Sequence, residues 1–130
     1  NANHLFAMGL PNRKAVAEKI ISLNCENVLI LGSGWEGSYS LEDSLAAGAL
    51  ADYLRENCNS EVDFVNDELQ ASLALWRFWE NDILECLKTA THGKRLTRIG
   101  DYEDDLKCCS ELDCLEIVPT QVERGVIRAS

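Results

Sequence analysis

The sequence predicts an α/β domain, because short, continuously apolar runs alternate with segments of helical periodicity. Residues 28–31, Val-Leu-Ile-Leu, form an apolar run bounded by Asn27 and Gly32, which is typical of a strand covered on both faces. A similar run at residues 5–8 precedes it, and the helical pattern of residues 12–23 lies between them. Strand, helix and strand in this order imply a right-handed crossover. We therefore expect a three-layer half-domain, with a small, mostly parallel sheet flanked by helices.

The rest of the chain adds helices and two short strands. Ser40 as an N-cap, with Asp43 three residues later to return the hydrogen bond, predicts a helix over residues 40–57. Gly48 inside this helix indicates a close contact with a neighbouring element. The longest helical pattern, residues 67–90, is broadly apolar, so it is either buried or forms a subunit interface through Trp76 and Trp79. A basic turn over 94–99, an acidic helix over 101–112, a strand over 115–118 and an antiparallel edge strand over 126–128 complete the expected fold.

Length and charge limit the function. The 130 residues suit one domain, and 12 basic against 22 acidic residues give a formal net charge of −10. Nucleic acids and anionic membranes attract basic surfaces, so neither is an expected partner. No apolar run approaches the roughly 20 residues of a transmembrane helix. The six cysteines are expected to be reduced and to serve as small core residues of a cytoplasmic protein.

A glycine-rich loop follows the predicted strand at 28–31. Residues 32–37, Gly-Ser-Gly-Trp-Glu-Gly, fit the dinucleotide-binding pattern, but in that fold the helix begins within the motif and here it begins at Ser40. The loop amides and the helix N-terminus suit a phosphate instead. Glu42 and Asp43, in the first helical turn, are of the type that binds Mg²⁺, or they only complement the helix dipole. The candidate substrate-binding residues of this segment are Ser33, Gly34, Trp35, Glu36, Gly37 and Ser40.

A compact cationic cluster, His92-Gly93-Lys94-Arg95, follows the long helical pattern. Arg95 is a candidate for bidentate binding of an anionic substrate. His92 is a candidate catalytic residue, although capping of a helix C-terminus explains it equally well. The acidic residues Asp104, Asp105 and Asp113 are most simply a solvated face.

Several of these motifs together resemble those of the 2-phosphosulfolactate phosphatase family. The matching segments are residues 34–43 with Ala47-Gly48, His92-Gly93 with Leu96, then Asp105, Cys109 and Asp113, and finally Val118-Pro119. They are in the family's order and cover nearly the whole chain. The resemblance implies an α/β enzyme that uses Mg²⁺ to hydrolyse 2-phosphosulfolactate to sulfolactate and phosphate, a step of coenzyme M synthesis in methanogens. It favours Glu42, Asp43 and His92 as catalytic residues, Asp43 and Glu42 as metal ligands, and Arg95 with the loop as the substrate site.

The chain departs from this family in length. Family members are about twice as long, and motifs resembling Ile-Asp-Val-Leu-Arg-Ala-Thr-Thr and Thr-Thr-Asn-Gly-Thr in their N-terminal half do not occur here. Residues 1–130 are therefore expected to be the C-terminal part of a longer phosphatase, with activity on its own in question. Two alternatives stay open: a non-catalytic half-domain that binds an anion or self-associates through the Trp76/Trp79 helix, and a small nucleotide-binding domain.

Overall fold

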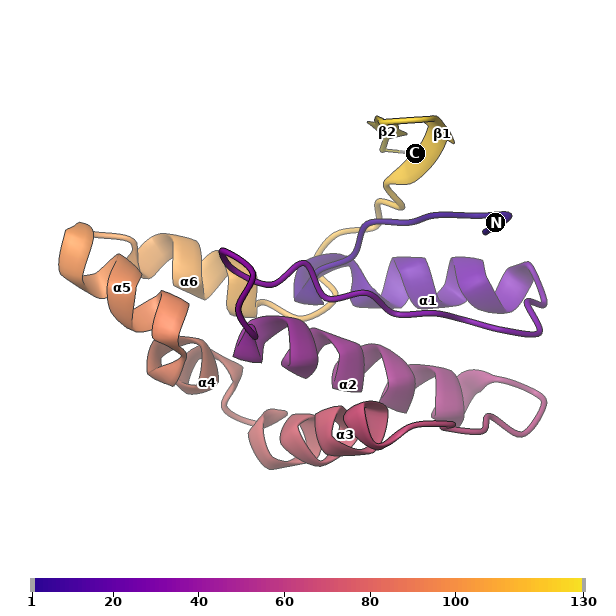
Figure 1. The fold of residues 1–130 in the computed structure, drawn as a ribbon, viewed down its shortest axis with the longest axis horizontal. Coiled ribbons are helices and arrows are strands. Elements are labelled where there is room, and N and C mark those ends of the chain that lie inside the picture. Colours follow the sequence, from indigo (N-terminus) through magenta and orange to yellow (C-terminus); the bar gives the residue numbers. More distant parts are fainter. Residues whose placement is uncertain (1, 130) are drawn as a thin grey trace.

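The structure, a computed structural model, describes residues 2–129. These residues form an α/β fold of six α-helices, one 3₁₀-helix and a two-stranded antiparallel sheet (Figure 1). The elements are η1 (Leu10–Asn12), α1 (Arg13–Ser22), α2 (Leu41–Asn57), α3 (Asp67–Trp79), α4 (Ile83–Thr89), α5 (Thr91–Ile99), α6 (Glu103–Ser110), β1 (Thr120–Glu123) and β2 (Val126–Arg128). The helices predicted over 12–23, 40–57 and 101–112 and the edge strand over 126–128 are thus confirmed, within a few residues at their ends.

Helices α1, α2 and α3 lie side by side, with α2 in the middle (Figure 1). The α2–α3 approach is close because residue 48 is glycine: a Cβ there would lie 2.0 Å from the backbone oxygen of Ser72. The close contact predicted from Gly48 is therefore confirmed as a contact between two helices.

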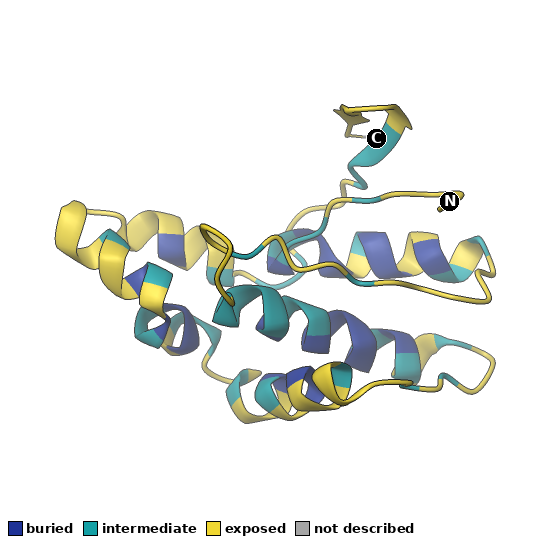
Figure 2. Ribbon diagram, in the orientation of Figure 1, coloured by how far each residue is buried: buried dark blue, intermediate teal, exposed yellow. Residues whose placement is uncertain are grey.

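The core consists of two clusters that share α2. One cluster joins η1 and α2 to α3, α4 and α6, and the other joins α2 to α1 (Figure 2). Their buried members are Leu10, Leu45, Ala49, Trp76, Cys86, Leu87 and Leu106 in the first, and Val16, Ala17, Ile20, Leu50 and Leu54 in the second. Trp76 is only 3% exposed, so it is a core residue, while the predicted subunit interface on this helix stays a prediction.

Two predictions for the middle of the chain, one of a helix and one of a turn, are wrong. The single helix expected over 67–90 is broken between α3 and α4, where the Asp82 amide donates to the Trp79 carbonyl in a turn. Asn81 and Asp82 favour such a turn, and the break lets α4 place Cys86 and Leu87 in the core. The basic turn expected over 94–99 is helix α5 instead. Its first turn packs tightly on α4 because residue 93 is glycine, where a Cβ would lie 1.8 Å from the Leu87 backbone oxygen.

The parallel sheet and the third layer are not present among residues 2–129. Residues 5–8, 28–31 and 115–118 lie outside the named strands; residues 5–8 contribute only an isolated bridge from Phe6 to Thr120. Two further backbone hydrogen bonds, from Ala7 to Pro119 (2.9 Å) and from Gln121 to Leu5 (2.9 Å), tie the N-terminal segment to the chain around β1. A strand forms only where a neighbour supplies partners for its backbone groups, so an apolar pattern alone does not make a sheet.

Polar residues at the start of α1 hold the C-terminal segment. The side-chain amide of Asn12 donates to the carbonyls of Ala7 (3.3 Å) and Ile117 (3.2 Å), and Arg13 forms an ion pair with Asp113. Asp113 is therefore a half-buried structural anion, and its assignment to a solvated acidic face is wrong. The same assignment holds for Asp104 and Asp105, which are exposed.

All six cysteines lie in the described part of the chain as free thiols. Only Cys86 is buried, whereas Cys25, Cys108, Cys109 and Cys114 are exposed, so the prediction that the cysteines fill the core is wrong for these four. Within residues 2–129, no helix is both long enough and apolar enough to cross a membrane.

Candidate functional site

The glycine-rich loop is a tight turn that returns the chain on itself before α2. Trp35 and Ser38 exchange two backbone hydrogen bonds, of 3.1 and 2.8 Å, and the two residues between them, Glu36 and Gly37, have φ angles of +49° and +78°. Two consecutive left-handed residues inside such a pair make a type I′ turn, for which glycine is favoured. Gly34 is required as well, because a Cβ there would lie 2.7 Å from the Ser38 oxygen.

Asp43 anchors this turn to the start of α2. Its Oδ2 accepts a hydrogen bond from the Gly34 amide (2.7 Å) and one from the Ser33 hydroxyl (3.4 Å). Ser40 caps α2 as predicted, since its hydroxyl oxygen accepts from the Asp43 amide (3.2 Å). The predicted return bond from Asp43 to the cap is wrong, because its carboxylate binds the loop. The carboxylate is thereby held beside the loop instead of closing a capping box.

The anchoring uses some of the amides that were expected to bind an anion. The amides of Gly34, Trp35 and Ser38 have intramolecular partners. Among the described residues, the amides of Glu36 and Gly37, at the tip of the turn, have no hydrogen-bond partner. The tip of the turn is therefore one part of the loop that remains open to an anion.

The structure brings the second predicted segment to the loop. The Trp35 ring lies 4.7 Å from the His92 ring, centroid to centroid, and the Arg95 guanidinium carbon lies 5.1 Å from the centre of the Trp35 ring. His92 and Arg95 come from the first and second turns of α5, more than fifty residues away along the chain. Within residues 2–129, the Nδ1 atom of His92 is buried without a hydrogen-bond partner, which leaves one polar atom unsatisfied at this contact.

Glu42 lies in a different environment from Asp43. Its carboxylate accepts a hydrogen bond from the Ser40 hydroxyl (3.0 Å). Burial raises the pKa of the Cys86 thiol to about 11, and the charge of Glu42 adds to the shift. The two neighbouring carboxylates therefore have separate partners: Asp43 binds the loop, and Glu42 binds the Ser40 hydroxyl.

The donor set fits a Mg²⁺ ion only in part. Among the described residues, no three histidine, cysteine, aspartate or glutamate side chains are grouped as metal ligands. Mg²⁺ needs few protein ligands, however, because it keeps several waters and binds substrate phosphates with one or two carboxylates. Asp43, held beside the loop by its bonds to Ser33 and Gly34, is the better of the two predicted ligands.

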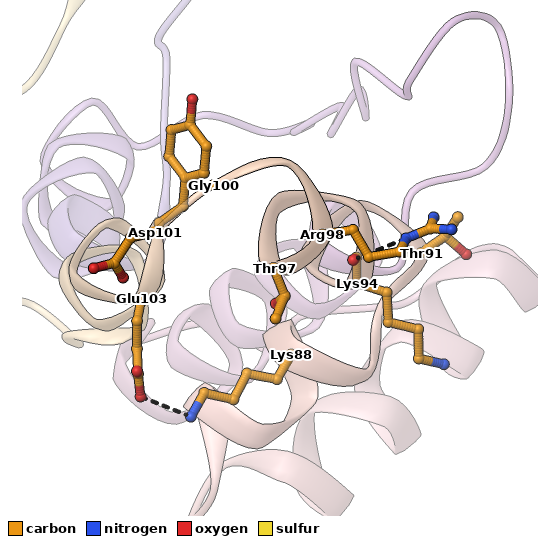
Figure 3. A pocket seen from close by; sticks show the side chains of 9 residues that line it. Lys88, Thr91, Lys94, Thr97, Arg98, Gly100, Asp101 and Glu103 are labelled. Carbon is orange, nitrogen blue, oxygen red and sulfur yellow. Dashed lines mark hydrogen bonds and ion pairs between the residues drawn. The ribbon is translucent and has the colours of Figure 1, made fainter.

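A second cationic feature, a cavity, is lined in part by residues of α5 (Figure 3). The cavity, of about 990 Å³, is lined by three basic residues, Lys88, Lys94 and Arg98, together with two threonines, Tyr102, Asp101 and Glu103. Lys88 is engaged, since its Nζ donates to Glu103 (3.3 Å). This cavity was not predicted, because a turn over residues 94–99 would not place Lys94 and Arg98 on one side. Their spacing of four residues is the signal that points to a shared helix face.

Comparison with known proteins identifies the family. The family model described as 2-phosphosulpholactate phosphatase matches residues 1–124. Among curated proteins, a "Probable 2-phosphosulfolactate phosphatase" of Prochlorococcus marinus (strain SARG) is 61% identical over 123 residues, which are 95% of this chain and 51% of the relative. Proteins of the same name match from Prochlorococcus marinus (strain MIT 9313), at 55% over 97% of the chain and 52% of the relative, and from Gloeothece citriformis, at 43% over 95% and 50%.

Each match covers a larger share of this chain than of the relative. The matches include nearly all of this chain, but the chain spans about half the length of the curated relatives it matches. The residues quoted above as the family's motifs, from the glycine-rich loop to Val118-Pro119, all fall within the matched range of 1–124. The chain belongs to the 2-phosphosulfolactate phosphatase family.

Proposed function

We propose that this chain forms part of a phosphatase that hydrolyses 2-phosphosulfolactate to sulfolactate and phosphate. The observation that carries the proposal is the meeting of the glycine-rich loop with α5, where Trp35 contacts both His92 and Arg95. Two segments whose sequences separately favour anion chemistry thus lie in one place. The names of the relatives supply the substrate, and the geometry supplies a reason for these residues to act together.

In this proposal, Arg95 and the tip of the loop bind the substrate's anionic groups. Arg95 is exposed and its guanidinium stacks on Trp35, which orients the planar group and leaves its N–H donors available. The amides of Glu36 and Gly37 are the further donors. Such local cations and donors are needed because the substrate carries several negative charges and the chain has a net charge of −10.

In this proposal, Asp43 binds the metal ion and His92 transfers a proton. Asp43 would hold Mg²⁺, with Glu42 as the second candidate ligand, and the ion would neutralise charge that develops on the phosphoryl oxygens. His92, with a buried nitrogen that lacks a partner among residues 2–129, is the candidate to carry a proton to the leaving oxygen. Ser33 and Ser40 keep Asp43 and Glu42 in place through their hydroxyl groups.

The test is release of phosphate from 2-phosphosulfolactate, measured with and without Mg²⁺, and in the presence of a chelator. Because the chain spans about half of its relatives, we expect it to be weakly active or inactive alone. The assay is therefore run twice, with the chain alone and with the chain co-expressed with the half of the strain SARG relative that has no counterpart here. We expect Mg²⁺-dependent release in the second preparation.

Variants make the assay specific for the proposed site. Asp43→Asn and Arg95→Ala should each lower kcat/KM at least tenfold, since the first weakens the proposed Mg²⁺ ligand and the second removes the cation that pairs with the substrate. Arg124→Ala, an arginine in the exposed β1–β2 turn, is the matched control and should leave activity unchanged. Equal activity of all three variants, or absence of release from a folded and complete preparation, would count against the proposal.

A further inference from the structure

The extended segments of the chain leave an apolar surface exposed. Leu29 and Leu31 are 80% and 79% exposed, and Leu5, Leu115 and Ile117 are between 40% and 46% exposed. We call these five residues the outer face. They come from the three segments, 5–8, 28–31 and 115–118, that have the sequence pattern of strands.

The opposite side of the same segments is packed. Phe6, Met8, Ile30 and Val118 lie against the core cluster that α1 and α2 form around Val16 and Leu50. Side chains in an extended chain alternate between two faces, so Ile30 points into the core while its neighbours Leu29 and Leu31 point away from it. Apolar residues on both faces are typical of a strand that is covered on both sides.

The backbone of residues 28–31 is also open. Among the described residues, none of its amides or carbonyls has a backbone hydrogen-bond partner. A groove of about 240 Å³ runs beside it; its apolar lining residues include Val28, Leu29, Ile30, Val65 and Leu69, and its polar ones are Asp43, Ser44, Asn66, Glu68 and Ser72. An extended segment with unpaired backbone groups beside a partly apolar groove is a template for an added strand.

We propose that the outer face is the docking surface for the polypeptide region of the relatives that lies outside their match with this chain, and that this region pairs a β-strand with residues 28–31. The length of the relatives argues for this occupant. At 61% identity, 95% of this chain matches only 51% of the strain SARG protein, so nearly half of that protein remains to be placed. The surface next to the groove includes Gly32 and Asp43, so the docked region would lie beside the candidate site.

A second copy of this chain is a poorer occupant. Each copy has a net charge of −10, so two copies repel one another as they approach. A second copy would also bring its own uncovered outer face and would add no new strand sequence. The docking inference rests on exposure, packing and the length of the relatives, and it holds whether or not the proposed phosphatase reaction is correct.

Co-expression tests the inference directly. The tagged 130-residue chain is produced together with the half of the strain SARG relative that has no counterpart here, and the purified material is analysed by size-exclusion chromatography with light scattering. We expect a 1:1 complex. Hydrogen exchange at alternate amides of residues 28–31 should slow by about 100-fold or more in the complex, because an added strand pairs every second residue of the edge that it joins.

Charged substitutions test whether binding occurs through the outer face or through nonspecific hydrophobic association. Leu29→Lys with Leu31→Lys should abolish the complex while leaving the circular dichroism of the chain unchanged, since both side chains are exposed. Phe78→Lys, which alters a 77% exposed aromatic residue on α3, is the matched control and should leave the complex intact.

Three results would overturn the inference. The first is a folded chain that does not co-purify with the other half. The second is a homodimer of the 130-residue chain whose residues 28–31 are protected from exchange. The third is a doubly substituted chain that binds as well as the original. No activity enters these measurements, so they can fail while the proposed function stands, or succeed while it fails.

Discussion

At the scale of single residues, the contact between Trp35 and Arg95 allows a prediction about substrate binding. Arg95→Lys keeps the positive charge but loses the planar group that stacks on Trp35 at 5.1 Å and that pairs with a phosphate through two hydrogen bonds. We therefore expect KM for 2-phosphosulfolactate to rise about tenfold, equivalent to about 1.4 kcal/mol, with kcat within about twofold of the original. Steady-state kinetics of the co-expressed preparation measure both quantities.

The same substitution elsewhere provides the comparison for Arg95→Lys. Arg124→Lys lies in an exposed turn and should change neither KM nor kcat. A KM for Arg95→Lys equal to that of the original chain would mean that charge alone suffices at this position. Stacking on Trp35 would then have no role in binding.

Cys86 gives a prediction about pH. Its side chain is 1% exposed, and burial with the nearby charge of Glu42 raises the pKa of the thiol from the ordinary 9.0 to about 11. The folded chain therefore keeps a proton that the unfolded chain releases between pH 9 and 11. The free energy of unfolding has its full value below pH 9 and should fall by about 2–3 kcal/mol at most as pH rises through this window.

Urea unfolding at several pH values measures this effect. Cys86→Ala should flatten the decline between pH 9 and 11, even though removal of the buried sulfur lowers stability at every pH. An unchanged decline in the variant would show that other groups cause it. At about pH 8, a thiol reagent should modify Cys86 only on global unfolding, whereas Cys25, which is exposed, should react at once.

At the scale of elements, Gly48 sets the distance between α2 and α3. Gly48→Ala improves the intrinsic preference for helix by about 1 kcal/mol, but the new methyl group would lie 2.0 Å from the Ser72 oxygen and 2.9 Å from the Trp76 Cβ. Backbone cannot move aside as a side chain can, so the helices must separate. We expect a net loss of about 2–3 kcal/mol in the free energy of unfolding, measured with urea.

A substitution on the exposed side of α3 calibrates this result. Ala74→Gly changes helix preference alone, because Ala74 is exposed, and should cost about 1 kcal/mol. If Gly48→Ala stabilised the chain instead, helix preference would outweigh contact, and the two helices would have room to adjust.

The helices could be predicted from the sequence because their signals are local. Ser40 caps α2 through its own side chain, and Pro11 starts the helical segment that leads into α1. The break between α3 and α4 could not be predicted with equal ease, because it depends on Cys86 and Leu87 reaching a core formed by distant residues. In the site, Ser40 and Asp43 were found by spacing, but the pairing of Trp35 with His92 joins residues that are far apart in sequence and needed the structure.

At the scale of the whole molecule, the sequence pattern and the structure differ in the predicted parallel sheet. Residues 28–31 have the composition of a strand covered on both faces, and the structure covers one face only, with Leu29 80% exposed. The composition of a segment reflects the environment in which the segment is stable. For residues 28–31 that environment includes cover on a second face, which residues 2–129 do not provide. Within residues 2–129 the pattern was therefore wrong about the sheet and about burial on both faces, and only Ile30 packs against the core.

The ion pair of Asp113 with Arg13 links the C-terminal segment to the start of α1. Asp113 accepts hydrogen bonds from the Arg13 Nε (3.2 Å) and from the Lys14 amide (2.8 Å), and forms an ion pair with Arg13. Arg13 in turn lies over the rings of Tyr53 and Trp76, at 5.1 and 5.5 Å, so one carboxylate fixes the C-terminal segment to α1 and the core. Asp113→Ala would leave the buried guanidinium without its anion, and we expect a loss of about 3 kcal/mol in the free energy of unfolding.

Comparison with an exposed ion pair shows whether Asp113 stabilises the fold by linking two segments or only by pairing with an opposite charge. Glu103→Ala breaks the Lys88–Glu103 pair, whose carboxylate is 57% exposed, and should cost less than about 1 kcal/mol. Because Asp113 holds the segment that carries Leu115 and Ile117, its loss should also speed hydrogen exchange from residue 113 to the end of β1 while α2 and α3 stay protected. Equal costs for the two substitutions, or faster exchange throughout the chain, would mean that Asp113 contributes charge without linking the two ends.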